Sequence, residues 1–333
     1  MPNLSMTRRA IKPGLITTAN RRRIGDAGAS ILILWLWTAL TGCAVMREPT
    51  PTVDEFLARA VDPGVETLAY EAQGSGTPIV LIHGLGASRY TWRHLAEPLA
   101  RRGQVIALDL KGSGDSPKPR DDAYSVYDQA ALVLDVLARL DLGEVILVGH
   151  SFGGGVALAT ALRLQQEDRL AALILIGSTG YEQPLPVFIQ LLKTPLVAPL
   201  GMRLLPARMQ VRAIMNRAFH DNDLVSDAAV DEYAATLQST AGRHALLRTA
   251  RQIIPSDLDT LPARYASIEA PVLLLWGRED RIVPLEVGRQ LHEALPHARL
   301  VILDAIGHMP QEEAPAATLM HVFRFLDEER LGR

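Results

Sequence analysis

The sequence has almost no cysteine and no marked excess of charge of either sign. Cys43 is the only cysteine among 333 residues, which excludes an internal disulfide and a cysteine-based zinc site. The formal net charge of −3 argues against a nucleic-acid partner, and no repeat of fixed period is evident. The composition, 48% hydrophobic and 21% charged, is that of a globular protein with a sizeable core. The chain is long enough for one large α/β domain with an insertion, or for two domains.

The N-terminal region has the pattern of a bacterial export signal. Three arginines at positions 21–23 precede an apolar run over 31–40, which has the length of a signal-peptide core. The Leu-Thr-Gly-Cys of residues 40–43 resembles the lipobox of bacterial lipoproteins. This resemblance implies cleavage before Cys43 and a lipid anchor, with acyl chains such as palmitate, at that residue. An uncleaved signal anchor is the alternative, because residues 27–45 are nearly long enough to span a bilayer.

We therefore expect a protein of the bacterial cell envelope, lipid-anchored at the outer membrane or the periplasmic face. The uncleaved anchor would place it at the inner membrane instead. The expected organisation is a signal peptide, a lipidated N-terminus with a proline-containing tether, and a core divided by an insertion. The corresponding ranges are 1–42, 43–65, 66–180 for the first part of the core, 181–262 for the insertion and 263–333 for the second part.

Short runs rich in Val, Ile and Leu alternate with helical patterns through most of the chain. Such runs are typical of parallel strands buried on both faces, so the alternation predicts a doubly wound, mostly parallel α/β sheet. Residues 67–72 are expected to add an antiparallel strand at the edge. The predicted strands are 78–82, 104–110, 144–148, 170–176, 271–276 and 299–303, and the predicted helices 91–102, 125–140, 152–165, 285–295 and 314–329.

Residues 181–262 contain no convincing strand and are predicted to form a helical cap inserted between sheet strands. Helical patterns occur at 187–192, 209–218, 227–238 and 245–252. The apolar residues of this region are expected either to line a pocket or to pack in the core of the cap itself. They are Phe188, Leu192, Leu196, Met202, Met209, Met215 and Phe219.

Residues 149–154, Gly-His-Ser-Phe-Gly-Gly, form the strongest motif. They follow a predicted strand and precede a predicted helix, which is the setting of the G-x-S-x-G nucleophile elbow. Glycines permit the sharp turn, and the turn lifts the Ser151 hydroxyl above the sheet. The helix N-terminus beside it offers free N–H groups to a developing oxyanion. Ser151 is therefore the predicted nucleophile.

A serine nucleophile needs a base, and the base needs a carboxylate that fixes its tautomer. After such an elbow the chain order is acid and then histidine. Asp280 follows the strand 271–276, with Glu279 as the alternative acid, and His308 follows the last strand. The carboxyl ends of parallel strands meet at one edge of the sheet, so these groups are expected to converge there. Glu312 and Glu313 are interpreted as charges at a helix N-terminus.

The oxyanion hole needs two backbone donors. One is the N–H of Phe152, and the other is expected from Leu85 in the loop His83-Gly84-Leu85-Gly86. His83 is interpreted as a residue that braces this loop, and His150 as too divergent in direction to act as the base. Ser113 and Ser116 are interpreted as parts of a structural turn.

Five motifs in this order resemble the α/β-hydrolase superfamily, and most closely its capped carboxylesterases, haloperoxidases and C–C hydrolases. They are His-Gly-Leu-Gly, Asp-x-x-Gly-x-Gly-x-Ser, Gly-His-Ser-Phe-Gly-Gly, Gly-x-x-Asp-x-x-Val-Pro and Gly-His-x-Pro. The resemblance implies a catalytic triad of Ser151, Asp280 and His308. Serine at the nucleophile position disfavours epoxide hydrolase and haloalkane dehalogenase chemistry, in which aspartate occupies it.

The predicted activity is hydrolysis of a carboxylic ester through an acyl-enzyme, without cofactor or metal. The expected partners are a small ester or acyl substrate with an apolar portion, and a membrane bound through Cys43. No nucleic acid or obligate protein partner is expected. The same triad is compatible with C–C, amide or thioester hydrolysis or with perhydrolysis. A binding lipoprotein without catalytic activity is the remaining alternative.

Overall fold

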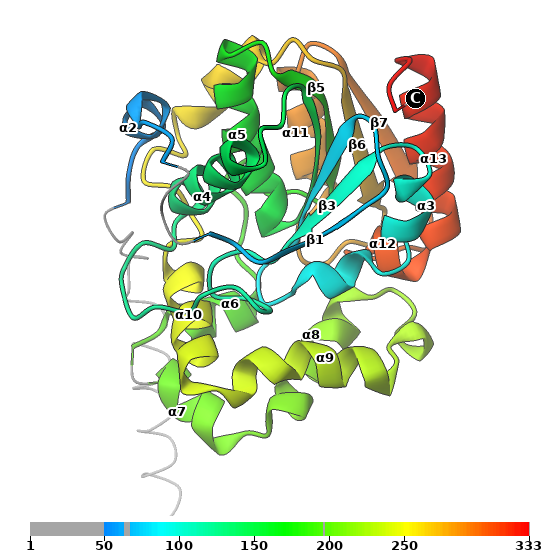
Figure 1. Cartoon of the computed structure of the whole chain (residues 1–333). Helices are drawn as coiled ribbons and strands as arrows, with labels where there is room; N and C mark the ends of the chain where they lie inside the picture. Colours follow the sequence, from blue (N-terminus) through cyan, green and yellow to red (C-terminus); the bar gives the residue numbers. More distant parts are fainter. Residues whose placement is uncertain (1–49, 63–66, 196, 333) are drawn as a thin grey trace, which may run out of the picture. The chain divides into compact units, whose positions relative to one another are not determined.

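The computed structural model describes residues 50–62, 67–195 and 197–332, in which a seven-stranded sheet carries helices on both faces (Figure 1). The strand order is β1-β3-β2-β4-β5-β6-β7, and only the β1–β3 pair is antiparallel. The predicted fold class and the antiparallel edge strand are confirmed. The strands are β1 (Tyr70–Gln73), β2 (Pro78–Ile82), β3 (Gln104–Leu108), β4 (Val145–His150), β5 (Leu170–Ile176), β6 (Val272–Gly277) and β7 (Ala298–Leu303).

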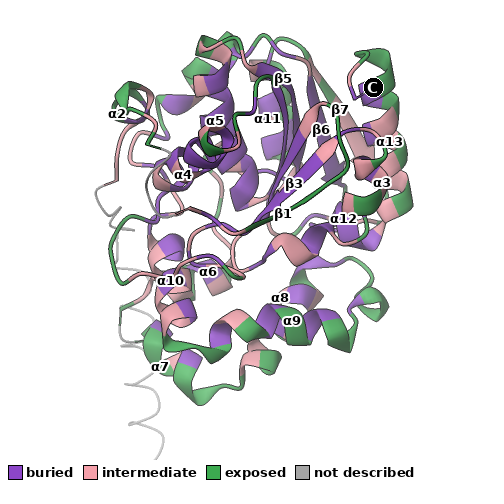
Figure 2. Cartoon of the chain, in the orientation of Figure 1, coloured by how far each residue is buried: buried purple, intermediate pink, exposed green. Residues whose placement is uncertain are grey.

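Alternate residues of each strand point into two separate apolar layers. In β2, Val80 and Ile82 pack with α4 (Val126–Arg139), α5 (Phe152–Gln166) and α11 (Leu285–Ala294). Ile79 and Leu81 pack on the other side with α3 (Ala96–Ala100) and α13 (Pro315–Glu328). Figure 2 shows the sheet buried between the two layers. Burial on both faces explains why these strands are continuous apolar runs in the sequence.

Local sequence explains where several helices begin. α4 starts, close to the beginning of the predicted helix 125–140, at a capping box in which Ser125 and Asp128 each bind the backbone N–H of the other. The predicted single helix over 91–102 is instead η1 (Arg89–Trp92) followed by α3. Pro98 would lie inside such a helix, where it removes a hydrogen bond and collides with the preceding turn.

Part of the region expected to be a tether is packed on the core. Thr52 caps α2 (Val53–Ala58), and the Phe56 ring stacks on Tyr127 of α4 with 5.6 Å between centroids. The Ser256 N–H donates to the Thr50 hydroxyl, 3.2 Å away. The described chain is therefore held against the folded unit from its first residue. Residues 1–49, including Cys43 and the predicted signal peptide, lie outside the described residues.

The segment between β5 and β6 is helical and forms a layer beyond the edge of the sheet (Figure 1). α7 was not predicted from the sequence. Its Pro199 is compatible with a helix because it lies in the first turn, where a missing N–H costs little. No single helix in the described ranges is long and apolar enough to cross a bilayer. α6 and α7 meet the length and composition criteria only as a pair bent by 110°. The helices are α6 (Val187–Lys193), α7 (Val197–Leu204), α8 (Ala207–Ala218), η2 (Asn222–Leu224), α9 (Asp227–Gln238), α10 (Thr240–Arg251) and η3 (Leu261–Ser267).

Candidate active site

Ser151 lies at the sharp corner between β4 and α5. Its backbone angles, φ 55° and ψ −122°, are outside the regions that L-residues favour, which costs of order 1–3 kcal/mol. A Cβ on Gly149 would lie 2.5 Å from the Gly153 carbonyl oxygen, and a Cβ on Gly153 would overlap the carbonyl oxygen of His83. Side chains at these positions would push the strand and helix apart, so the two glycines permit the corner.

Asp280 and His308, which follow β6 and β7, are brought into contact at the same edge of the sheet. His308 Nδ1 donates to Asp280 Oδ2 over 2.7 Å, and both side chains are buried. The other Asp280 oxygen accepts the N–H groups of Ile282 and Val283, each at 2.8 Å. Three hydrogen bonds thus fix the carboxylate. Because Asp280 occupies Nδ1, Nε2 is the nitrogen left to act on Ser151, which lines the same cavity as His308.

The alternative acids bind elsewhere. Glu279 Oε2 accepts the Ile306 N–H at 3.1 Å, so this carboxylate supports the loop that leads to His308. Asp304 forms an exposed ion pair with Arg278. Of the carboxylates considered in this region, Asp280 is the one that binds His308.

Both predicted oxyanion donors belong to segments that border Ser151. Phe152 is the first residue of α5, so its N–H is one of the first four helical donors, which have no partner within the helix. Leu85 lines the cavity with Ser151. The preceding glycine, Gly84, is so close that a Cβ there would lie 3.0 Å from Ser151 Cβ.

His83 and His150 are buried and neutral supports of the site. His83 Nδ1 donates to the Gly84 carbonyl at 2.8 Å, and His83 Nε2 accepts the Leu110 N–H at 3.0 Å. His150 Nε2 donates to the His308 carbonyl at 2.9 Å, a contact that sequence reasoning missed. Burial lowers the pKa of both imidazoles, and the neighbouring His308 lowers that of His150 further. His150 therefore positions the His308 backbone without carrying charge.

Glu312 and Glu313 lie in the first turn of α12 (Pro310–Glu313), directly after His308, as their interpretation as charges at a helix N-terminus expected. Both are also buried and support the site, which the sequence did not indicate. The Glu313 carboxylate accepts the N–H groups of Gly307 and His220, at 3.0 and 2.7 Å, and so joins the histidine loop to the chain after α8. Burial raises the pKa of Glu313 against the opposing effect of these N–H groups.

Glu312 links the core to the cap. Its carboxylate accepts the Thr91 hydroxyl at 2.7 Å and the Arg93 guanidinium at 2.8 Å, and also binds the Tyr233 hydroxyl of α9. Burial, together with the charge of Glu312, raises the pKa of Tyr233 well above its usual value, so the hydroxyl remains a donor. The partners lie more than 70 residues away in sequence, so no local pattern could have revealed this network.

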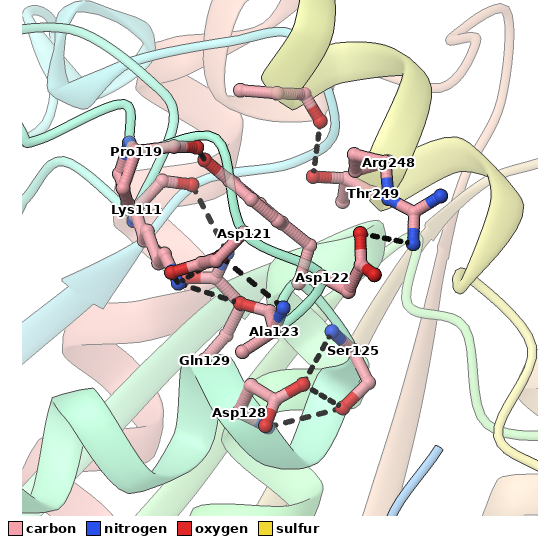
Figure 3. A network of polar contacts seen from close by, with 12 residues as sticks. Lys111, Pro119, Asp121, Asp122, Ala123, Ser125, Asp128, Gln129, Arg248 and Thr249 are labelled. Atoms are coloured by element: carbon pink, nitrogen blue, oxygen red, sulfur yellow. Dashed lines mark hydrogen bonds and ion pairs between the residues drawn. The ribbon is translucent and has the colours of Figure 1, made fainter. Parts of the chain in front are cut away.

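A second polar network attaches α10 to the core (Figure 3). Arg248 pairs with Asp122 at 2.6 Å, while Lys111 binds Asp121 at 2.8 Å and the Ala123 carbonyl at 2.9 Å. Lys111 belongs to the Asp109–Ser116 motif, and Asp121, Asp122 and Ala123 lie in the loop that follows it. In that motif Ser116 accepts the Ala69 N–H, so it stabilises a turn.

A cavity of about 140 Å³ lies between the sheet edge and the cap. Its described lining contains no Lys, Arg, Asp or Glu, and its polar side chains are Ser151, His308, His150, Thr179, Gln183 and Tyr233. The remaining lining is mainly aliphatic. Among the described residues no group of three His, Cys, Asp or Glu is placed to hold a metal ion.

The apolar cap residues named from the sequence divide between the two expected roles, with one exception. Phe188 and Leu192 line the cavity, Met202 and Phe219 pack in the core of the cap, and Met215 does both. Met209 does neither, because it is 62% exposed. Leu196 lies outside the described residues.

Comparisons with known proteins agree with this geometry. A family model described as alpha/beta hydrolase fold matches residues 77–315. A 2-hydroxymuconate semialdehyde hydrolase of Pseudomonas sp. (strain CF600) is 31% identical over 273 residues, which cover 80% of this chain and 92% of that protein. The structure of a meta-cleavage product hydrolase from Pseudomonas fluorescens has a TM-score of 0.69 and 26% identity, covering 78% of this chain and 94% of the other. A thermophilic esterase from Thermogutta terrifontis has a TM-score of 0.63 and 25% identity, covering 79% and 93%.

Proposed function

The chain belongs to the α/β-hydrolase family, and from this premise we propose that it cleaves carboxylic esters through an acyl-enzyme on Ser151. The observation that carries the proposal is the buried 2.7 Å contact between Asp280 and His308, at the wall of the cavity that contains Ser151. This contact fixes the tautomer that a serine nucleophile requires.

In the proposed reaction Ser151 Oγ attacks the ester carbonyl while His308 Nε2 takes its proton. The carbonyl oxygen becomes an oxyanion that accepts hydrogen bonds from the N–H groups of Leu85 and Phe152. The C–O bond of the ester then breaks, and His308 returns the proton to the departing alcohol. Water attacks the acyl-serine with His308 again as base, which releases the acid and restores Ser151. Asp280 holds Nδ1 throughout.

The cavity favours an uncharged substrate with an apolar acyl group. A carboxylate buried in the cavity would need a cationic partner, and the described lining contains no Lys or Arg. A 2-hydroxymuconate semialdehyde carries such a carboxylate. C–C hydrolysis is nevertheless the second candidate. A 2-hydroxymuconate semialdehyde hydrolase and a 2-hydroxy-6-oxo-2,4-heptadienoate hydrolase are 31% and 30% identical to this chain.

A substrate panel tests both candidates. Wild type and Ser151→Ala are assayed on p-nitrophenyl butyrate and on 2-hydroxymuconate semialdehyde. We expect ester hydrolysis by wild type only. Equal ester hydrolysis by both proteins would contradict the role of Ser151. Turnover of the semialdehyde without ester turnover would instead establish the second candidate.

We further propose that Cys43 carries a lipid anchor and that the enzyme works in the bacterial envelope. The support is the apolar run at 31–40 followed by the only cysteine of the chain. The intact mass of the membrane-extracted protein should correspond to a chain that begins at Cys43 and carries acyl groups. A mass that retains residues 1–42 unmodified would indicate the uncleaved anchor.

A further inference from the structure

The outer surface of the cap carries a concentration of exposed apolar side chains. Ten large apolar side chains are exposed in the described chain, and seven of them lie within residues 187–209. They belong to α6, α7 and the stretch from the end of α7 into the first turn of α8, and Figure 2 colours most of the ribbon around α7 as exposed. The seven are Val187, Leu191, Val197, Leu200, Leu204, Leu205 and Met209.

α7 is apolar on two opposite faces. Ala198 and Met202, four residues apart, are buried against the protein, whereas Val197, Leu200 and Leu204 form a stripe that points outward. Leu204 is 70% exposed. An inward stripe is sufficient to hold a helix on a globular protein. A second apolar stripe on the exposed side therefore indicates a contact with something outside the described residues.

α6 has one face on the catalytic cavity and the other on this surface. Phe188 and Leu192 line the cavity, while Val187 and Leu191 of the same helix are exposed. A single helix thus forms the wall between the exposed apolar surface and the reaction cavity. An apolar molecule held at that surface would have only this helix to pass before reaching the cavity.

The charge of this surface identifies its partner. Residues 183–206 contain no aspartate or glutamate, and their exposed charged side chain is Arg203, whereas the Lys193 ammonium is buried. A symmetric contact with a second copy would bring Arg203 no carboxylate from the same segment. An anionic lipid bilayer offers acyl chains for the leucines and a phosphate for Arg203.

The N-terminal region would place a bilayer near this surface. Only six residues, 44–49, lie between the proposed lipid attachment at Cys43 and Thr50, a reach of at most about 25 Å. Thr50 is bonded to Ser256, and the adjacent Pro255 lines a cavity together with Leu185, two residues before α6. The chain therefore enters the folded unit beside the segment that leads into α6.

We propose that the outer face of α6 and α7 docks on an anionic bilayer and that the cavity receives its ester substrate from that bilayer. The docking rests on the proposed anchor, and the delivery rests on the proposed ester hydrolysis. Lateral entry of an apolar ester past α6 would avoid its transfer through water.

The docking is tested with an environment-sensitive NBD label on Leu204→Cys in the full chain with Cys43 retained, because a lipid on the Cys43 sulfur blocks that thiol from the label. The unsubstituted chain, labelled in parallel, measures any signal that comes from Cys43. The matched control carries the label at Met320→Cys on α13, which is also exposed but lies on a different side of the molecule (Figure 1). Vesicles of phosphatidylglycerol and phosphatidylethanolamine should blue-shift the emission at 204, and doxyl-lipids should quench it, with no change at 320.

Three results would overturn the docking. Protein that co-floats with the vesicles in a density gradient but shows no change in NBD emission at position 204 would refute the docking and leave the lipid anchor standing. Protein that does not co-float would refute both the docking and the anchor. A blue shift at 204 that is present without vesicles and grows with protein concentration would assign the surface to a second copy.

The delivery is tested with the double variant Leu200→Asp, Leu204→Asp, neither residue of which lines the cavity. We expect kcat/KM for 4-methylumbelliferyl palmitate in the same vesicles to fall about tenfold or more, because two leucines no longer enter the lipid. Hydrolysis of soluble p-nitrophenyl acetate should not change, and Met320→Asp should behave as wild type. Equal losses on both substrates would contradict delivery from the bilayer. If the wild-type protein hydrolysed neither ester, the ester proposal would be refuted. The fluorescence of the NBD label would still decide the docking.

Discussion

Replacing Asp280 by asparagine separates the catalytic role of this residue from its structural one. An asparagine oxygen in the place of Oδ1 would keep the two 2.8 Å hydrogen bonds from Ile282 and Val283. Its NH2 group would then face His308 Nδ1, where the carboxylate accepts a proton donor in the native protein. A donor facing Nδ1 favours the tautomer with the proton on Nε2. In that tautomer His308 cannot take the Ser151 proton.

We expect Asp280→Asn to fold normally and to lose kcat by roughly 10⁴-fold, equivalent to about 5.4 kcal/mol of transition-state stabilisation. The measurements are kcat on p-nitrophenyl butyrate and thermal unfolding of the same preparation. Glu279→Gln is the matched control, because Gln can still accept the Ile306 N–H at this position. The control should keep near wild-type activity.

Two outcomes would refute this reasoning. Asp280→Asn that keeps more than about a tenth of wild-type kcat would show that the carboxylate does not orient the base. A larger loss in Glu279→Gln than in Asp280→Asn, with both proteins folded, would move the role of the acid to Glu279.

Three further predictions concern the elements that support the site. Gly153→Ala should unfold at lower temperature and lose activity, because its Cβ would overlap the His83 carbonyl; unchanged melting would contradict the account of the corner. The free energy of unfolding should fall as pH drops below about 6.5, by up to about 1.4 kcal/mol per pH unit for each buried imidazole, His83 and His150. Stability falls in this direction because burial lowers the folded-state pKa, so the unfolded chain binds more protons than the folded one below about pH 6.5. His150→Gln should reduce the change in unfolding free energy per pH unit, measured by urea denaturation at a series of pH values. An unchanged pH dependence would exclude His150 as a contributor. Tyr233→Phe should lower stability by about 1–3 kcal/mol through loss of its bond to Glu312, which differential scanning calorimetry would detect and an unaltered unfolding profile would disprove.

The sheet and the corner at Ser151 were predictable because their causes are local. Strands buried on both faces need continuous Val, Ile and Leu, and a strained Ser151 needs glycines at 149 and 153. The contact between Asp280 and His308 could also be predicted, since side chains that follow parallel strands meet at one edge.

The supports of the site could not be predicted, because they depend on tertiary contacts. Glu312 resembles an ordinary helix-end charge until Thr91, Arg93 and Tyr233 are placed around it. The His150 bond to the His308 carbonyl joins residues 158 positions apart. α7 was missed because prolines at positions 195, 199 and 206 interrupt its neighbourhood.

The central claim, that Ser151 is an activated nucleophile, is tested most directly by labelling the folded protein with a fluorophosphonate and measuring intact mass and the modified peptide. The account predicts one adduct, located on Ser151, absent from Ser151→Ala and strongly slowed in His308→Gln. A folded protein that gains no adduct, or gains it at a turn serine such as Ser113 or Ser116, would contradict the claim.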